Sequence, residues 1–262
     1  MKKIITIVLA LVLVITLAAC SGKKADVLSI GATPVPQAEL LNLIKDDLKA
    51  AGVNLKIVEF TDYVQPNMAV MAGDLDANFF QHIPYLGSNI DWLENLIPAF
   101  GVHIEPFGLY SQKFKSIDDL PEGASIAIPN DPSNGGRALF LLEANGLITL
   151  KEDTGFLATV RDITSNPKNL KFQELEAALL PRSLQDVDAA AINGNYALES
   201  GFNPINDSLI IEDGNSPYVN IVVVKKGNEE DAKILALRDA LLSNKVRDYI
   251  FSNYGGGVVP VF

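Results

Sequence analysis

The sequence predicts an α/β protein of two related lobes, joined by two crossover segments. Three observations lead to this prediction. The mature chain opens with a strand, a helix and a second strand; a similar pattern returns in its second half; and an apolar strand with two helices remains at the end. Alternation of strands and helices is typical of parallel sheets covered by helices.

An export signal precedes the first lobe. Lys2 and Lys3 are followed by an uncharged, mostly apolar run over residues 4–19. This run is shorter than the about 20 residues that a membrane-spanning helix needs. A positive start, a short apolar run and small residues before a cleavage point are typical of a secretory signal, so we expect residues 1–19 to be removed. A retained signal anchor is the weaker alternative, because no positive stop-transfer cluster follows.

Cys20 is the only cysteine of the chain, and it follows Leu17-Ala18-Ala19. This stretch resembles the bacterial lipobox, which implies cleavage before Cys20 and a diacylglyceryl group on its sulfur. A lone cysteine has no partner for a disulfide within the chain. We therefore expect residues 20–26 to form a lipidated tether, with the protein anchored on the extracytoplasmic side of a cell membrane.

The charge of the chain excludes some classes of partner. Loss of Lys2 and Lys3 changes the formal net charge from −11 to about −13, with an acylated N-terminus counted as neutral. Nucleic acids bind through lysine and arginine, so an acidic chain is a poor match for them. Direct binding to anionic lipid is disfavoured for the same reason.

The first lobe begins with a strand over residues 27–32. Residues 38–51 are predicted to be helical, because Leu40, Leu41, Ile44 and Leu48 fall on one face. Residues 53–60 alternate like a strand. A further helix is expected over residues 65–72.

The second lobe repeats this order of strands and helices. Residues 124–129 are a predicted strand, and a helix follows from Asp131 through Leu142, because Asp is favoured at the N-cap and Pro in the first turn. Residues 175–184 are also read as helical. The motif over residues 74–80 (Asp-Leu-Asp-Ala and an apolar run) returns as Asp-Val-Asp-Ala over residues 186–192. Chance similarity of a short motif is the alternative.

The end of the chain has to return to the first lobe. An apolar strand over residues 221–224 precedes helices over residues 231–242 and 244–252. We therefore predict one lobe from residues 27–105 and 219–262, and a second lobe from residues 106–218. Two crossovers would form a hinge, and the cleft between the lobes is a favoured ligand site.

Signals of catalysis are weak. His82 and His103 are the only imidazoles, and neither accompanies a Ser in a Gly-x-Ser-x-Gly turn. His103 and Glu105 offer two metal ligands, whereas a structural zinc site needs four. The glycines at 255–257 precede no helix and are read as an exposed or flexible end. We expect no enzymatic activity, no cofactor and no metal.

Six stretches together resemble the MetQ/NlpA family of methionine-binding lipoproteins. They cover residues 31–36, 58–67, 76–86, 128–139, 191–197 and 216–221. The resemblance implies a two-lobed periplasmic-binding-protein fold (type II-like) and the role of substrate-binding component of an ABC importer. The implied partners are methionine, with both its L- and its D-form as candidates, and an ABC permease with its ATPase subunit.

The resemblance also implies a ligand site. Arg137, read as lying in the first turn of its helix, would hold the ligand carboxylate, since a helix start and a guanidinium both favour an anion. A surface pair with Glu143 is the alternative. Asn193 and Asn220 would bind the amino-acid end, with Asn220 ranked first and Asn134 and Asn195 below both. The alternative for the two is a role as turn formers.

Aromatic residues would surround the thioether, which packs well at ring edges. Tyr63, Phe80, His82 and Tyr85 are the candidates; Phe80 and His82 face the same way on an extended segment, and Tyr85 is placed in the loop that follows. Phe79 is assigned to the core. Phe80 could also be core, and His82 a hydrogen-bonding loop residue.

Other functions stay open at this point. The amino-acid end shows no clear carboxylate for an ammonium, so a dipeptide ending in methionine, or another small amino acid, is an alternative ligand. An anchored hydrolase that uses His82 or His103 as a base, and an adhesin without a small ligand, are the alternatives of other classes.

Overall fold

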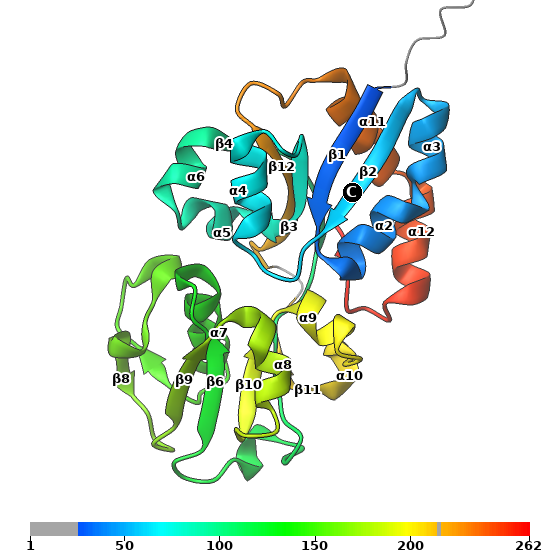
Figure 1. Cartoon of the computed structure of the whole chain (residues 1–262). Helices are drawn as coiled ribbons and strands as arrows, with labels where there is room; N and C mark the ends of the chain where they lie inside the picture. Colours follow the sequence, from blue (N-terminus) through cyan, green and yellow to red (C-terminus); the bar gives the residue numbers. More distant parts are fainter. Residues whose placement is uncertain (1–25, 214–215) are drawn as a thin grey trace, which may run out of the picture.

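Two sheets, each covered by helices, form two lobes stacked along the long axis of the molecule (Figure 1). The computed structural model describes residues 26–213 and 216–262. The predicted signal over residues 1–19, the lipid on Cys20 and the tether up to residue 25 lie outside the described residues. Within the described ranges, no helix has both the length and the apolar character needed to cross a membrane.

The first lobe has a six-stranded sheet in the order β13-β4-β12-β3-β1-β2. Its strands are β1 (Asp26–Ala32), β2 (Val53–Glu59), β3 (Ala77–His82), β4 (Leu96–Ile104), β12 (Val219–Lys225) and β13 (Val259–Pro260). Its helices are η1 (Pro34–Ala38), α2 (Glu39–Leu43), α3 (Lys45–Ala50), α4 (Gln65–Ala72), α5 (Ile83–Gly87), α6 (Ile90–Asn95), α11 (Ala232–Leu241) and α12 (Asn244–Asn253).

The second lobe has a five-stranded sheet in the order β11-β5-β10-β6-β9, with a small β7-β8 hairpin beside it. Its strands are β5 (Gly108–Tyr110), β6 (Ser125–Pro129), β7 (Thr149–Leu150), β8 (Ile163–Ser165), β9 (Lys171–Leu175), β10 (Ala189–Ile192) and β11 (Ser208–Ile211). Its helices are η2 (Ile117–Asp119), α7 (Pro132–Ala144), η3 (Gly155–Leu157), η4 (Val160–Asp162), η5 (Ala177–Leu179), α8 (Leu180–Ser183), α9 (Gly194–Glu199) and α10 (Pro204–Asp207).

The two lobes share one strand pattern. In the first, β1 pairs in parallel with β2 and β3, and β12 is antiparallel to β3. In the second, β6 pairs in parallel with β9 and β10, and β5 is antiparallel to β10. The predicted strand–helix–strand opening with parallel pairing is confirmed, and so is the relation between the two halves.

The repeated Asp motif makes the same contacts in both lobes. Asp76 Oδ2 accepts hydrogen bonds from the backbone N and Oγ of Ser29, each at 2.7 Å. Asp188 Oδ2 accepts the same pair from Ser125, at 2.8 and 2.9 Å. Each aspartate joins the start of one central strand to its parallel neighbour. The motif is therefore a structural device that the lobes share.

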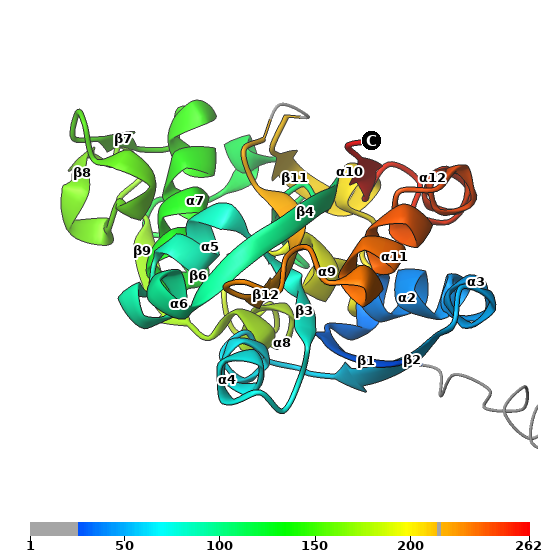
Figure 2. The same ribbon diagram turned by 90° about the horizontal axis from the view of Figure 1, so that it is seen from above.

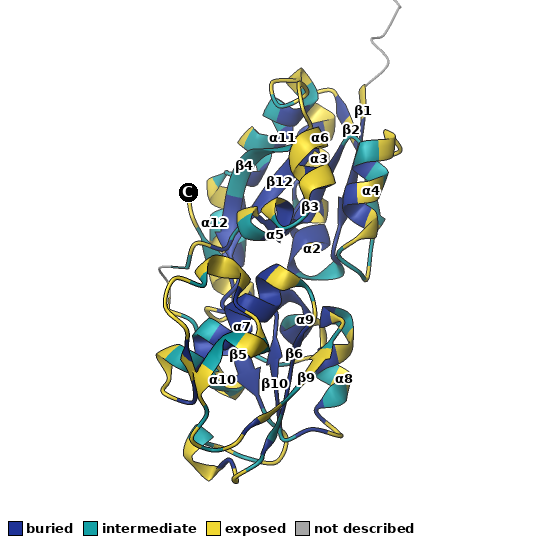
Figure 3. Ribbon diagram, turned by 90° about the vertical axis from the view of Figure 1, so that its left-hand side faces the viewer, coloured by how far each residue is buried: buried dark blue, intermediate teal, exposed yellow. Residues whose placement is uncertain are grey.

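Side-chain alternation divides the core of the first lobe between the two faces of its sheet. On β12, Val222 and Val224 pack into the cluster under α2, α3, α11 and α12, whereas Ile221 and Val223 pack with α4 and α6 on the other face. Successive strand residues point to opposite faces, so an apolar run marks a strand buried on both sides. Figure 3 shows both sheets largely buried beneath partly exposed helices.

The predicted helix over residues 38–51 is interrupted. Its four core residues are buried as expected, but Ile44 has φ −96° and ψ 1° and separates α2 from α3. Ile44 is fully buried. The periodicity of the apolar side chains survives a single irregular residue, and for this reason the pattern did not reveal the break.

Two further predictions were wrong in part. Residues 175–184 are not one helix, because Leu175 ends β9 and only short turns of helix follow over residues 177–183. β9 is an edge strand without a fully buried residue, so it lacks the apolar alternation that marks a strand. The glycines at 255–257 are also not the flexible end that we predicted. Gly255 and Gly256 make a turn with positive φ, and β13 then pairs with β4.

The chain crosses between the sheets twice, first over residues 105–107 after β4, and then between the end of β11 at Ile211 and the start of β12 at Val219. Seen from above, β12 runs beside β4 and β3 (Figure 2), so the returning chain is built into the middle of the first sheet. The carboxyl ends of β3, β6 and β10 lead to His82, Asp131 and Asn193. Ligands of open α/β sheets bind outside the carboxyl ends of strands.

Candidate functional site

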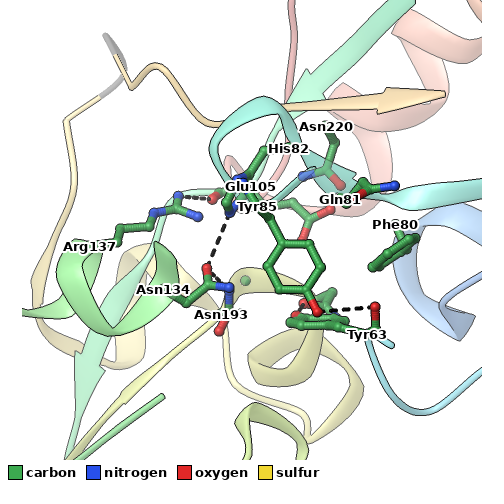
Figure 4. A pocket seen from close by; sticks show the side chains of 12 residues that line it. Tyr63, Phe80, Gln81, His82, Tyr85, Glu105, Asn134, Arg137, Asn193 and Asn220 are labelled. Atoms are coloured by element: carbon green, nitrogen blue, oxygen red, sulfur yellow. Dashed lines mark hydrogen bonds between the residues drawn. The ribbon is translucent and has the colours of Figure 1, made fainter. Parts of the chain in front are cut away.

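A cavity lies between the lobes. All seven predicted ligand-binding residues line it: Tyr63, Phe80, His82, Tyr85, Arg137, Asn193 and Asn220. Its remaining lining residues are Gln81, Glu105, Asn134, Gly194 and Asn195. Figure 4 shows Arg137 and Asn134 on one side of the cavity and Phe80 and Tyr63 on the other. The cavity thus has a polar end and an aromatic end.

Three rings form the aromatic end. The ring centroid of Tyr63 lies 5.7 Å from those of Phe80 and Tyr85, and Phe80 and Tyr85 lie 6.0 Å apart, edge to face. The hydroxyl of Tyr85 donates to the carbonyl of Tyr63 at 3.1 Å. Burial is the main cause that raises the pKa of Tyr63 well above its usual value. The rings present an apolar wall, and Phe79 lies in the core as predicted.

His82 ends β3 and caps the next helix. Its Nδ1 accepts from the backbone N of Tyr85 at 3.1 Å. Tyr85 therefore sits in helix α5 rather than in the loop that we predicted, because Pro84 is compatible with a first helical turn. Since Nδ1 accepts, the proton of a neutral ring lies on Nε2, which contacts Asn134 Oδ1 at 3.2 Å.

The environment of His82 favours the neutral ring. Burial, and after it the nearby Arg137 guanidinium, lower the pKa of His82 from 6.5 to about 3. The imidazole is thus uncharged near neutral pH, and its Nε2–H links the first lobe to Asn134 of the second. Asn134 Oδ1 also accepts from Asn193 Nδ2 at 2.8 Å. Asn134, ranked low from the sequence, is the centre of this contact.

Arg137 lies in the second turn of α7, not in the first as predicted, because the helix starts at Pro132. Its side chain is 4% exposed. Nε and Nη2 donate to the carboxylate of Glu212 at 2.7 and 2.6 Å. The alternative of a surface pair with Glu143 is wrong, since Glu143 accepts from the backbone N of Leu150.

A buried polar network supports Asn220. Asn220 Oδ1 accepts from Gln37 Nε2 at 3.0 Å, and the same nitrogen donates to Glu105 Oε1 at 2.6 Å. His103 Nε2 lies 2.7 Å from Glu105 Oε1. His103 and Glu105 are therefore a hydrogen-bonded pair. Within the described part of the chain, no group of three or more His, Cys, Asp or Glu side chains is arranged to hold a metal ion.

Sequence reasoning missed Glu105 and Gln81 as lining residues. Glu105 was weighed only as a metal ligand, although the residue is buried at the polar end. Nothing in the sequence around Glu105 distinguishes a buried glutamate from a solvated one. Gly194 also lines the cavity; a Cβ there would lie 2.7 Å from Glu105 Cβ, so the two lobes approach closely at this glycine.

Reciprocal contacts hold the lobes together near the aromatic end. The hydroxyl of Tyr63 donates to Asn195 Oδ1 at 2.5 Å, and the hydroxyl of Tyr196 donates back to the carbonyl of Thr61 at 3.0 Å. The rings of Tyr63 and Tyr196 stack with centroids 5.0 Å apart. Tyr63 and Thr61 precede α4 of the first lobe, whereas Asn195 and Tyr196 belong to α9.

The arrangement can bind a small zwitterion with an apolar tail. A guanidinium and amides suit a carboxylate, a buried carboxylate suits an ammonium, and ring edges suit an apolar, polarizable group. The residues come from both lobes, and Glu105 comes from the first crossover, so a ligand here would contact both lobes at once.

Comparison with known proteins extends over both lobes. A sequence model of the NlpA lipoprotein family matches residues 28–262. The membrane lipoprotein TpN32 of Treponema pallidum (strain Nichols) is 44% identical over 242 residues, which are 92% of this chain and 90% of that protein. The methionine-binding lipoprotein MetQ of Bacillus subtilis (strain 168) is 42% identical over 276 residues, which are 100% of this chain and 99% of that protein.

A solved structure gives the same result for the fold. The nutrient-binding protein of Burkholderia cenocepacia, solved bound to methionine, superposes with a TM-score of 0.87 at 44% identity, over 90% of this chain and 100% of that chain.

Proposed function

The chain belongs to the NlpA lipoprotein family, and from this premise we propose that it captures methionine outside the cytoplasm and delivers it to an ABC permease. The family and the two-lobed fold expected from the sequence are both confirmed. The observation that carries the proposal is the cavity between the lobes, with a buried guanidinium at one end and three aromatic rings at the other.

The polar end supplies partners for both charges of a free amino acid. Arg137 donates to the ligand carboxylate, and the side-chain amides of Asn193 and Asn220 complete its coordination. Glu105 supplies the negative charge for the ligand ammonium, which the sequence had left without a partner. Asn193 Oδ1 is a buried acceptor without a hydrogen-bond partner among the described residues, so it is available to the same ammonium.

The aromatic end of the cavity is the proposed place of the methionine side chain. The thioether lies against Tyr63, Phe80 and Tyr85, where sulfur–ring contacts are favourable. The proposed site does not select between L- and D-methionine by charge alone, since both carry the same groups.

Capture works by closure of the two lobes over the ligand. The proposed lobes are residues 27–105 with 219–262, and residues 106–218, and the two crossovers act as the hinge. A ligand shifts the equilibrium toward closure only through its higher affinity for the closed form. The closed form then docks on the permease, and lipid on Cys20 keeps it nearby at high effective concentration. We infer that the protein is a carrier rather than an enzyme.

Ligand-induced stabilisation tests the proposal. Full-length protein in detergent is unfolded to strip any bound ligand, refolded, and melted by circular dichroism with L-methionine, D-methionine, Gly-Met or other amino acids. At about 100 times the dissociation constant, the ligand should add about 2.7 kcal/mol of stability. Absence of a shift with every methionine compound would contradict the assignment.

Two substitutions test the amino-acid end. Arg137→Ala and Asn220→Ala should each weaken methionine binding strongly in calorimetric titrations, because each removes a partner of the ligand's polar groups. Glu122→Gln, on an exposed residue of the second lobe, is the matched control. Unchanged affinity in both site variants would mean that the amino-acid end lies elsewhere.

A further inference from the structure

The Arg137 guanidinium is enclosed by residues of both crossovers. Its central carbon lies 5.0 Å from the ring centroid of Phe107, in the first crossover, and 4.1 Å from that of Tyr218, in the second. Nη2 also donates to the carbonyl of Glu105 at 3.0 Å. The group proposed to hold the ligand thus contacts both hinge segments.

Glu212 completes this enclosure. It is the first residue after β11, and its backbone N donates to the carbonyl of Phe107 at 2.9 Å. Its Oε2 accepts from the backbone N of Phe107 at 3.2 Å. One side chain therefore joins the two crossovers to each other and joins both to Arg137.

The hydrogen bonds leave one edge of the guanidinium for a ligand. Arginine has five N–H donors. The single donor on Nε and one on Nη2 go to Glu212, and the second on Nη2 goes to Glu105. None of the described residues accepts a hydrogen bond from Nη1. Since Arg137 lines the cavity, the two Nη1 donors are the ones available to a carboxylate there.

We propose that Glu212 is a positioning residue: it fixes the guanidinium so that Nη1 faces the ligand carboxylate, and it couples that contact to both crossovers of the hinge. This inference rests on the function proposed above. Glu212 does not touch the ligand, and its side chain is 14% exposed. A bidentate arginine–carboxylate pair has fixed geometry, which suits this role.

Glu212→Asp tests the positioning because it keeps the charge. The shorter side chain cannot reach Nε, Nη2 and the Phe107 amide together, while the electrostatic effect on an anionic ligand is kept. Glu122→Asp is the control, since Glu122 is exposed and accepts only from Asn169 Nδ2. Affinities for methionine and for methioninol, which lacks the carboxylate, are measured by calorimetry on full-length, ligand-stripped protein in detergent.

We expect Glu212→Asp to weaken methionine binding by about 10-fold or more, the effect of one lost hydrogen bond to a charged group. Methioninol binding should stay the same in this variant, and Glu122→Asp should change neither. An unchanged methionine affinity, or an equal loss for both ligands, would overturn the inference. If the unaltered protein binds no methionine, the proposed function itself fails, which is a distinct result.

Hydrogen exchange in the unaltered protein provides a second test, which needs no substitution and therefore cannot fail because a variant misfolds. Methionine should slow exchange of the Phe107 amide more than methioninol does at equal saturation, because only methionine has a carboxylate that engages Arg137. Equal protection by the two ligands would refute the coupling between the carboxylate contact and the hinge.

Discussion

A fall in pH from 8 to 5 is expected to destabilise this protein through His82. The ring is buried, its Nδ1 accepts from the backbone of Tyr85, and Arg137 is close by. A proton on Nδ1 would remove that acceptor and place a second cation near the guanidinium. Burial and Arg137 therefore lower the pKa of His82 from 6.5 to about 3.

The sign of the effect follows from proton binding in the two states. Between pH 6.5 and pH 3 the unfolded chain binds a proton on this histidine and the folded protein does not. The free energy of unfolding is thus unaffected above this window and falls as the pH is lowered through it. At pH 5 the difference is about 1.5 pH units at about 1.36 kcal/mol each, or about 2 kcal/mol.

The assay compares urea unfolding of ligand-stripped wild type and His82→Asn at pH 8 and pH 5. Asparagine keeps a side-chain acceptor for the Tyr85 amide, since it is a favoured N-cap residue. The variant loses the contact with Asn134 at both pH values, and this loss cancels in the comparison. Wild type should lose about 2 kcal/mol more than the variant. Equal losses would show that His82 is not held neutral by the fold.

Three other experiments test separate parts of the structure. Glu105→Gln should weaken methionine binding about 10-fold in calorimetry, because the ammonium loses its counter-charge; no change would exclude Glu105 from the site. Tyr196→Phe removes the hydrogen bond to Thr61 between the lobes, which is a loss of about 1 kcal/mol. Methionine should therefore dissociate about five times faster in stopped-flow experiments. An unaltered rate would contradict a role of this hydrogen bond in the closed form. Ser29→Ala and Ser125→Ala should lower stability by similar amounts, about 1–3 kcal/mol in urea unfolding, and strongly unequal effects would argue against equivalent roles.

The parallel framework of each lobe could be predicted because its signals are local. The apolar run of β12 and the N-cap residue Asp131, which marks the start of α7, depend only on neighbours in the chain. The repeated Asp motif predicted two related lobes, and its aspartates make equivalent hydrogen bonds in both. β9 was missed because an edge strand has little apolar alternation to detect.

The candidate site could be predicted only in part. The seven residues named from the resemblance line one cavity, which no spacing along the chain would require. Glu105 and Glu212 were not predicted, since an isolated glutamate in a sequence looks the same whether it is solvated or buried beside an arginine. Their roles depend on partners distant in sequence: Gln37 for Glu105, and Arg137 for Glu212.

The sequence by itself determined the α/β class, the order of most elements, the internal repeat and the family, because these follow from local periodicity, turn residues and short motifs. Only the tertiary structure decided which charges meet. It placed Asn134 at the centre of the contact between the lobes, and it paired Arg137 with Glu212 rather than Glu143. The reason is physical: an ion pair between buried groups requires close approach, and Glu212 meets Arg137 only because the chain that leaves β11 passes close to the Arg137 side chain.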